Sequence, residues 1–545
     1  MTLEFSRIKV RSGVFCLTSL FAFGVSCIGQ AETFEEALIS AYNTHPQLLA
    51  ERARLREIDE TYVQARAQGR LSADINANTG FSESQLTQSS VFGGPTTTSN
   101  NLKPHSGQIQ FVQPLYTGGR VSALKQQARQ GILAARQNLR NIEQEIFLTT
   151  ATAYVDVIRD ENVALLRRQN VRVLDKQEVA SLERFRLGDG TRTDIAQSRS
   201  RIAGAEIGLA QADAQLASSR ALYTEAVGHP PNALTPAPNF IIPDTLEEAK
   251  SLARQNNPQL IAAKFNEKAG DAAIEIAKSA YRPTVSINGS YQASEGVSVN
   301  QIESETSSIV AQLSIPLLTG GATGSQLRSA KHARTRLTFE TRTAQRTLDR
   351  QVAQLWGQLE ATKRSLVASQ TQAEAAQGAL KGVELEKKVG TRTTLDVLDA
   401  EEELLNAQLS VVQVQRDLDV IHFQILTLLG AFDAEALRLA TDYYDPTANF
   451  RSVKYKGQDA LIDRFVPEFV QDIGGHLPDI PKNIVGLVDD TGIPQAVSED
   501  LENLAKPPAF IGTLAKESVD FITIQTPEYD QVPEFEPVEL IHDDE

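Results

Sequence analysis

The alternation of hydrophobic and polar residues along this chain changes its period several times, and each period predicts a different element. Apolar and polar side chains alternate one by one from Asp74 to Asn78, which is typical of a β-strand. The same alternation predicts four strands, over residues 72-83, 105-116, 284-295 and 306-317. Strands with one apolar and one uncharged polar face suit a barrel wall between lipid and water. A half-buried strand of a soluble sheet has the same pattern, so the strands alone leave both interpretations open.

Two proline-free helical stretches of about 66 residues follow these strands, Val121 to Arg186 and Thr323 to Lys388. At 1.5 Å per residue each helix would be about 100 Å long, which is far longer than the helices of ordinary globular domains. Apolar residues recur in them at spacings of three and four, as in a coiled coil. Gly188 and Gly390 are suited to end these helices, and shorter helices follow. The pattern predicts two long antiparallel hairpins, over residues 120-228 and 322-430.

The chain contains an internal duplication. Thr33-Phe-Glu-Glu-Ala recurs as Thr245-Leu-Glu-Glu-Ala at an offset of 212, and Pro114-Leu-Tyr-Thr-Gly-Gly recurs from Pro316 at an offset of 202. We expect the difference between the offsets to be an enlarged loop in the first copy, near residues 92-101, which are rich in Gly, Thr, Ser and Asn. The predicted organisation is a signal peptide (1-31), a first repeat (32-228), a linker (229-244), a second repeat (245-430) and a C-terminal extension (441-545).

The first 31 residues have the pattern of a secretory signal. Three basic residues precede the apolar run from Val14 to Ile28, and small residues follow up to Ala31. The run is too short to cross a bilayer as a helix, and no later run reaches the ~20 apolar residues that a crossing needs. Cys16 and Cys27 are the only cysteines, so cleavage after Ala31 would leave no disulfide or thiolate site. The alternative is a lipoprotein acylated at Cys27, although Gly24 is unusual three positions before such a cysteine.

Charge is concentrated at the C-terminus. Residues 441-545 contain 22 acidic and 7 basic residues, a net charge of −15 out of −16 for the whole chain, and ten of the 22 prolines. The near-neutral remainder argues against a nucleic-acid-binding face. We expect the extension to be largely disordered or loosely docked in the periplasm. The sharper alternative is an acidic segment that docks on an adaptor or the cell wall.

The sequence predicts neither an enzyme nor a cofactor or metal site. The seven histidines are scattered without metal-ligand spacing, and the glycine pairs at 118 and 320 lack the lysine of a phosphate loop.

The segment Val389-Gly-Thr-Arg-Thr-Thr-Leu-Asp-Val-Leu-Asp-Ala400 resembles the signature turn of the TolC family of outer-membrane efflux and type I secretion channel proteins. The duplicated layout fits the same family, and the resemblance covers about residues 32-440. It implies a mostly α fold with a membrane β-barrel contribution, built from a duplicated helix-strand-strand-long helix-helix unit. It further implies a homotrimer in which a twelve-stranded β-barrel in the outer membrane joins a twelve-helix periplasmic α-barrel.

The function that the resemblance implies is a passive outer-membrane exit channel of a tripartite efflux pump or type I secretion system. Its implied partners are outer-membrane lipid, a periplasmic adaptor (membrane fusion protein) and an inner-membrane pump of RND or ABC type. The helical barrel and the C-terminal tail would lie in the periplasm. A soluble periplasmic coiled-coil adaptor or scaffold is the alternative, because it would share the signal and the hairpins. It would not need the four alternating strands.

The resemblance also implies a periplasmic gate at the hairpin turns. Asp396 and Asp399 correspond to aspartates that face the pore in the family, and three copies would place six carboxylates around a cation-favouring constriction. The residue spacing supports a second interpretation. Thr393 with Asp396, like Thr191 with Asp194, has the spacing of a helix N-cap and an acidic residue in the first turn.

A latch is implied beside this gate. Arg392, Thr193 and Asp194 correspond to residues that link neighbouring hairpins in the family, and a contact between Arg392 and Asp194 is the expected latch. Lys387 stands where the best-known member of the family has an aromatic residue of the latch, so the closed network is expected to differ there. A solvated charge at a helix turn is the alternative for Arg392.

Overall fold

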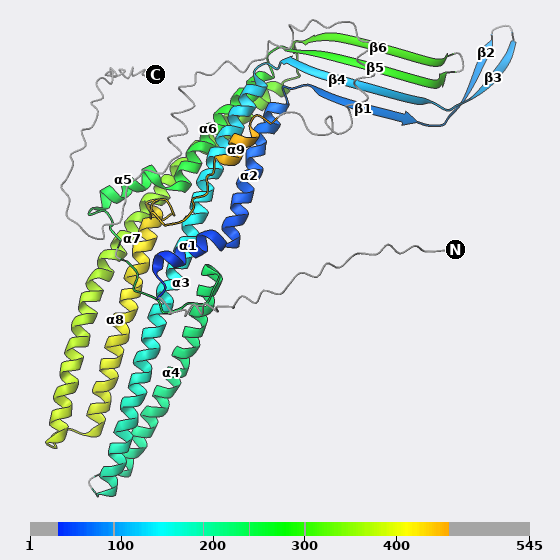
Figure 1. Cartoon of the computed structure of the whole chain (residues 1–545). Helices are drawn as coiled ribbons and strands as arrows, with labels where there is room; N and C mark the ends of the chain where they lie inside the picture. Colours follow the sequence, from blue (N-terminus) through cyan, green and yellow to red (C-terminus); the bar gives the residue numbers. More distant parts are fainter. Residues whose placement is uncertain (1–30, 91–92, 189, 239, 299–300, 457–545) are drawn as a thin grey trace, which may run out of the picture.

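The computed structural model describes residues 31–90, 93–188, 190–238, 240–298 and 301–456. The predicted signal peptide, apart from Ala31, and residues 457–545 of the predicted extension lie outside the described residues. Figure 1 shows an elongated molecule, with the strands at one end and the turns of two long helical hairpins at the other.

The helices and strands follow the predicted duplication, except that each copy begins with two helices instead of one and the first copy has two additional strands. The first copy contains α1 (Phe34–Thr44), α2 (Pro46–Ala67), β1 (Ser72–Thr79), β2 (Ser82–Ser90), β3 (Gly93–Leu102), β4 (His105–Tyr116), α3 (Arg120–Arg186) and α4 (Arg192–Val227). The second contains α5 (Leu246–Asn256), α6 (Pro258–Ser279), β5 (Thr284–Ser298), β6 (Gln301–Ser314), α7 (Ala322–Lys388) and α8 (Thr394–Leu428). One short helix, α9 (Ala448–Val453), follows the second copy.

Four strands form one antiparallel sheet in the order β1-β4-β5-β6. Strand β1 ends before the predicted boundary of residue 83, and β6 covers 301–314 instead of 306–317. The predicted enlarged loop at 92-101 is wrong, because β3 occupies most of it and pairs with β2 in a separate hairpin. The hydroxyls of Thr87 and Thr97 are 3.0 Å apart across this hairpin. Threonine favours strands, and its cross-strand pairs stabilise them even where no apolar alternation exists.

The two long helices each span 67 residues, within one residue of the predicted bounds. Each begins after a glycine in the left-handed region, Gly119 and Gly321, both with φ of 84°. Towards the hairpin turns the helices lie in the order α4, α3, α8, α7, whereas towards the sheet α2 and α6 pack against α3 (Figure 1). The predicted hairpins therefore form one layer beneath the sheet.

A hydrophobic core lies at the waist of the molecule, where α1 crosses the long helices (Figure 1). Its largest side chains are aromatic and come from α1, α3, α4, α8 and the segment after α8. They are Phe34, Phe147, Tyr154, Tyr223, Phe423 and Phe432, none more than 3 % exposed. Burial of several aromatic side chains at one level fixes the two hairpins relative to each other.

Residues 441–456, here called the C-terminal strap, run along α2 towards the sheet. Asn449 Nδ2 donates to Asp59 Oδ2 at 2.9 Å, and the ring of Phe450 packs edge-on against Tyr62. Near the sheet, Arg70 Nη1 donates to the carbonyl of Lys456 at 3.0 Å. The described part of the predicted extension is therefore docked on the helices.

Candidate functional site: a two-faced sheet and the hairpin turns

The sheet has one apolar and one polar face, as the alternation predicts. The register aligns Ile75 with Ile109 and Ile109 with Tyr291, and these side chains share one face. On that face the ring of Phe111 lies over Gly289, where any added Cβ would meet the ring at 1.8 Å. Glycine is therefore required there by the close approach of the aromatic side chain.

The opposite face is polar and nearly uncharged. Asn76, Gln108, Gln292 and Thr306 are aligned across all four strands. Their neighbours form side-chain ladders, and the hydroxyl oxygens of Ser290 and Ser308, for example, lie 2.9 Å apart. A sheet of this kind suits contact with lipid on one side and with water on the other.

The apolar face is exposed in a single chain, and so are the sheet edges. Ile75, Ile309 and Leu313 are 68 %, 66 % and 61 % exposed. Among the described residues, β1 pairs only with β4 and β6 pairs only with β5. The sheet therefore has two open edges and a large uncovered apolar surface, which mark a surface for lipid or further chains.

At the other end of the molecule, both hairpin turns contain capped helix starts. The hydroxyls of Thr191 and Thr393 accept hydrogen bonds from the backbone N–H of Asp194 and Asp396, and each carboxylate accepts one from the threonine N–H. The backbone hydrogen bond from Thr393 lowers the pKa of Asp396, with help from the threonine hydroxyl. In the structure both aspartates therefore make the hydrogen bonds of a helix N-cap.

Asp399 lies in an ion-paired cluster between the two hairpins. Arg201 Nη2, on α4, donates to Asp399 Oδ1 at 2.6 Å, and Nη1 of the same guanidinium donates to Glu402. Asp399 and Glu402 are three residues apart, so they lie on one face of α8. Arg201 was not expected from the sequence, because it is 198 residues from Asp399 and neighbouring residues give no sign of the contact.

Within one chain, Arg392 does not contact Asp194 as the expected latch would require, and Arg392 and Lys387 both bind other residues. Arg392 Nε donates to Glu386 Oε2 at 2.8 Å, and Arg392 lies 4.0 Å from Asp396. Lys387 Nζ donates to Gln177 Oε1 at 3.3 Å, and so joins α7 to α3. Burial lowers the pKa of the half-buried Lys387, and Arg184 adds to this, while Asp194 acts in the opposite direction. The side chain of Lys387 is thus within electrostatic range of the first-copy turn.

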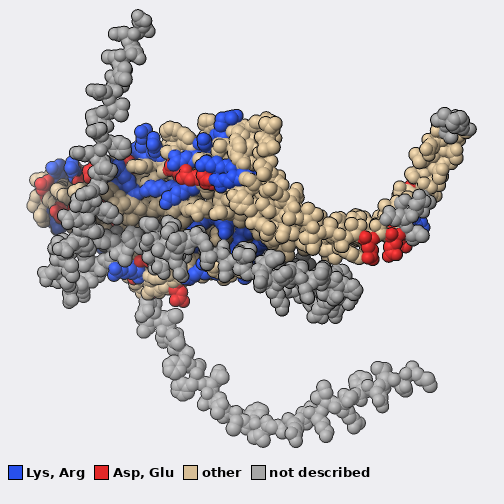
Figure 2. Space-filling model, turned by 90° about the horizontal axis from the view of Figure 1, so that it is seen from above, with Lys and Arg blue, Asp and Glu red and all other residues tan. Residues whose placement is uncertain are grey.

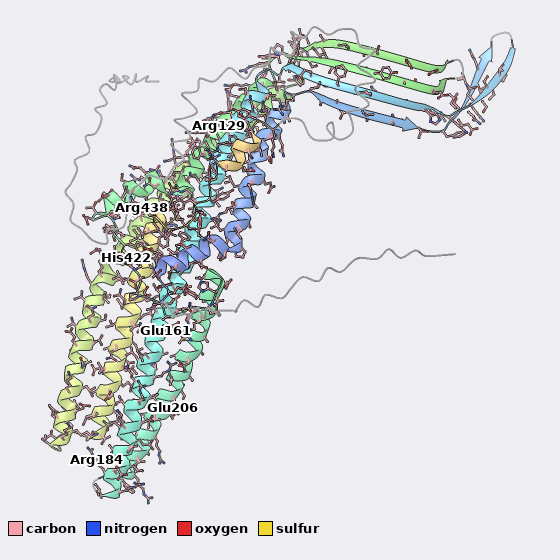
Figure 3. The ribbon with its side chains drawn as sticks, in the orientation of Figure 1. Arg129, Glu161, Arg184, Glu206, His422 and Arg438 are labelled. Atoms are coloured by element: carbon pink, nitrogen blue, oxygen red, sulfur yellow. The ribbon has the colours of Figure 1, made fainter. Side chains whose placement is uncertain are left out.

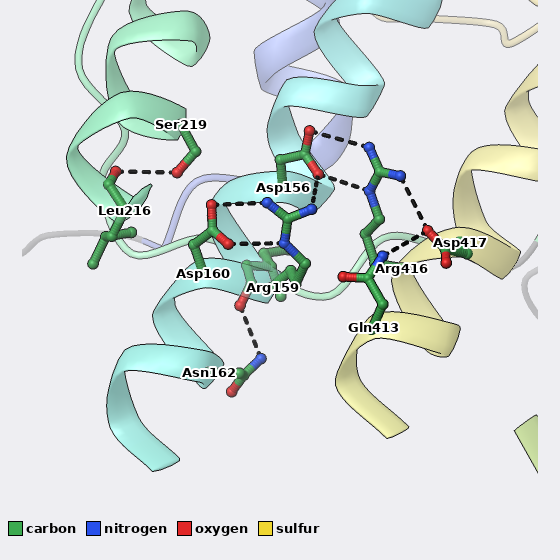
Figure 4. A network of polar contacts seen from close by, with 10 residues as sticks. Asp156, Arg159, Asp160, Asn162, Leu216, Ser219, Gln413, Arg416 and Asp417 are labelled. Carbon is green, nitrogen blue, oxygen red and sulfur yellow. Dashed lines mark hydrogen bonds and ion pairs between the residues drawn. The ribbon is translucent and has the colours of Figure 1, made fainter. Parts of the chain in front are cut away.

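A second network, here called the brace, joins α3 to α8 nearer the waist (Figure 4). Arg416 binds Asp156 through two hydrogen bonds of 2.7 and 3.2 Å, and Asp156 also pairs with Arg159 at 3.0 Å. Asp160 and Asp417 complete the brace through Arg159 and Arg416, respectively. The paired side chains are no more than 21 % exposed except for Asp417. Bidentate arginine–carboxylate pairs of this kind fix the relative orientation of the two helices as well as neutralising charge.

Other kinds of site were sought in the part of the chain that the structure describes. None of its helices has the length and apolar character to cross a bilayer. Its His, Asp and Glu side chains form no group that could hold a metal ion.

An amphipathic antiparallel sheet above two helical hairpins of this length defines the class of outer-membrane export channels. The family model for outer membrane efflux proteins matches residues 38–229 and 249–431. The outer membrane efflux protein BepC of Brucella suis biovar 1 (strain 1330) is 31 % identical over 439 residues, which cover 79 % of this chain and 93 % of BepC. The chain belongs to the outer membrane efflux protein family, the family of TolC.

Two further comparisons agree with this assignment. TolC of Vibrio cholerae serotype O1 (strain ATCC 39315 / El Tor Inaba N16961) is 26 % identical over 420 residues, 74 % of this chain and 92 % of that protein. The crystal structure of VceC from Vibrio cholerae has the same fold, with a TM-score of 0.60 and 20 % identity over 73 % of this chain and 96 % of that chain.

The family decides between the two functions that the sequence predicted. The chain is a passive outer-membrane exit channel and not an enzyme, with its helical hairpins on the periplasmic side. As family members act in multi-protein efflux or secretion systems, the chain works together with partner proteins.

Proposed function

We propose that the chain assembles as a homotrimer whose twelve strands close one barrel and whose hairpins form a tunnel beneath it. The two-faced sheet with its open edges is the observation that carries this proposal. Four strands are too few to close a membrane barrel, whose known forms start at about eight. An open edge is not tolerated in lipid. Three copies pair every edge and turn every apolar face outwards.

The periplasmic entrance of this tunnel would be gated by α8. In this proposal Asp396 and Asp399 line the constriction, and Arg201 holds Asp399 and Glu402 towards α4 in the closed state. Loss of the Arg201 contact would free two carboxylates and release α8 from α4. The ion pair that connects the two hairpins supports a gate that opens by their separation.

The latch between neighbouring chains completes the closed state. Arg392 would reach Asp194 and Thr193 of the next copy, while its bond to Glu386 holds the guanidinium near the turn. Lys387, which contacts Gln177 within its own chain, would hold the neighbouring turn through its charge.

A passive channel of this kind needs other proteins to supply energy and cargo. We propose a periplasmic adaptor (membrane fusion protein) that contacts the hairpin turns and an inner-membrane pump of RND or ABC type. The channel has no site for a cofactor in this proposal, and the pump selects drugs or unfolded protein as cargo. Residues 1–31 would be removed on export, which leaves a chain without cysteine.

The absence of cysteine from the mature chain allows a direct test by cross-linking of the sheet edges. Ile75→Cys on β1 is combined in turn with a cysteine at each of four positions on the same face of β6. These positions are Ser307, Ile309, Ala311 and Leu313. Because a disulfide needs Cβ atoms about 4 Å apart, one or two of these combinations should give covalent trimers on oxidation.

The control uses Ile109→Cys on β4, which lies inside the sheet, with the same four partners in β6. It should give no trimers, since β4 is paired on both sides by its own chain. Monomers alone in all eight variants would contradict the proposed ring of three chains.

A further inference from the structure

Charge is distributed unevenly along the long axis of the molecule. The strands β1 to β6 contain no Lys or Arg, and apart from Asp74 the acidic residues of the four-stranded sheet lie at the end far from the helices. There Glu295 is aligned with both His105 and Glu303. Figure 2 shows the arm of strands as mostly uncharged, with acidic side chains and a smaller basic patch where the arm bends, and with most basic side chains over the helices.

The helix ends at the base of the sheet are basic instead. On α3 the first acidic residue is Glu143, and on α7 it is Glu340, so about 35 Å and 27 Å of helix carry basic but no acidic side chains. We call eight of the basic residues near the sheet the basic collar. They are Arg66, Arg70, Arg120, Arg129, Lys278, Arg282, Arg328 and Lys331. Figure 3 labels Arg129 in this position, close to the strands.

Most of the positive charge of the basic collar is not neutralised within the described part of the chain. Glu275 pairs with Lys278 at 2.7 Å and lies 3.7 Å from Arg282. Arg120, Arg328 and Lys331 are exposed and have no ion-pair partner among the described residues. Arg120 is the first residue of α3, and Arg328 and Lys331 lie within the first ten residues of α7. Three uncompensated charges near the sheet-side ends of the two long helices favour an anionic ligand.

Apolar and aromatic side chains connect this charge to the apolar face of the sheet. Tyr116 is aligned with Val285 in the row of that face nearest the helices, and Leu317 and Leu318 beyond it are 86 % and 96 % exposed. The hydroxyl of Tyr281 and Nη1 of Arg328 converge there, because a Cβ added to Gly324 would lie 3.4 Å from each. Tyrosine is enriched where a membrane surface meets water, and arginine binds phosphate.

We propose that the basic collar binds the headgroups of anionic phospholipids in the leaflet that faces the helices. This inference rests on the proposed insertion of the sheet in the membrane. Lipid is the occupant that the surface favours, since the collar continues directly from the apolar face that the acyl chains would cover. The far end, where Glu295, Glu303 and Glu305 outnumber Lys103, would repel the same headgroups, so binding occurs at one leaflet only and fixes the depth of the sheet.

The test is native mass spectrometry of the full-length protein with equal amounts of phosphatidylglycerol and phosphatidylcholine, at low and high salt. We expect a preference for phosphatidylglycerol that salt weakens, because exposed charges are screened. Each Lys or Arg near an anionic surface contributes about 1 kcal/mol. The triple variant Arg120→Gln/Arg328→Gln/Lys331→Gln should therefore lower the ratio of bound phosphatidylglycerol to phosphatidylcholine by at least about tenfold.

The matched control removes three exposed arginines from the hairpins, Arg186→Gln/Arg199→Gln/Arg220→Gln, and should keep the wild-type ratio. An equal ratio in the collar variant and wild type would overturn the inference. So would the absence of any preference in wild type, which would mean that another partner, such as the acidic residues 457–545, covers the collar. Neither result affects the cross-linking of the sheet edges, so failure of this inference is distinguishable from failure of the proposed trimer.

Discussion

Helices α3 and α7 occupy equivalent places in the two copies and have the same length, yet they are covered very differently. Helix α3 buries 22 residues and α7 only seven. The reason is position, since α3 lies between α4 and α8, whereas α7 is at the edge of the layer (Figure 1). Exposed apolar side chains remain on α7, such as Phe339 and Val367 at 59 % and 64 %. One chain is therefore covered on one side and open on the other, as expected for one sector of the proposed trimer.

The largest effect is expected from a matched pair of phenylalanines on these helices. Phe147 on α3 is fully buried, so Phe147→Ala should lower the free energy of unfolding by about 3–5 kcal/mol. Phe339→Ala on α7 should change the stability of a single chain by less than about 0.5 kcal/mol, but weaken assembly. Denaturant unfolding and the oligomer mass in detergent measure the two effects. Equal loss of chain stability in both variants would contradict the distinction between the covered helix α3 and the exposed helix α7.

The brace should stabilise the covered helix more than exposed ion pairs do. Arg416→Ala leaves Asp156, whose side chain is only 18 % exposed, with one partner fewer, and we expect a loss of about 2 kcal/mol. The control is Arg199→Ala, since Arg199 pairs with Glu178 but is 66 % exposed, and it should cost less than about 1 kcal/mol. Thermal unfolding of both variants gives the comparison, and an Arg416→Ala effect no greater than the control would show that the brace adds no stability.

A smaller, pH-dependent effect is expected on α8. Burial raises the pKa of Asp419 to about 6, against an opposing hydrogen bond from Gln415. The folded protein therefore binds this proton more tightly, so the contribution of Asp419 to stability is greatest below pH about 4, falls as pH rises to about 6, and is constant above. Asp419→Asn should stabilise the protein by about 1–2 kcal/mol at pH 7.5 and by nothing below pH 4. The same gain at both pH values would mean that Asp419 does not titrate in this way.

The smallest effects should be equal in the two copies. Thr191→Ala and Thr393→Ala each remove an N-cap hydrogen bond at a hairpin turn, and each should cost about 1 kcal/mol. Hydrogen exchange at the first turns of α4 and α8 would report the loss locally. A much larger effect of Thr393→Ala would mean that the second turn depends on its cap in a way that the first does not.

Local features of the sequence predicted the elements well. The ends of α3 and α7 follow from glycine and from the length of the proline-free stretches, and the alternation around Ile75 and Ile109 predicted which side chains share a face. The β2–β3 hairpin was missed because Ser, Thr and Asn occupy both of its faces, so no alternation marks it.

The contacts of the site were harder to predict from the sequence than the residues that form it. Asp396 and Asp399 could be selected by their resemblance to a family motif, but the pairing of Asp399 with Arg201 depends on how two hairpins pack. The same holds for Asp156 and Arg416, which are 260 residues apart. Nothing in the local pattern distinguishes these arginines from solvated ones, since their partners are set by tertiary structure.

Single-channel conductance in planar bilayers tests the central claim most directly, with wild type beside Asp396→Ala/Asp399→Ala and Arg201→Gln. We predict small cation-selective currents for wild type, loss of selectivity in the double variant, and larger currents in Arg201→Gln because α8 is released from α4. Insertion without any change of selectivity or current in the variants would contradict the proposed gate, and failure of the wild-type protein to form channels would contradict the account as a whole.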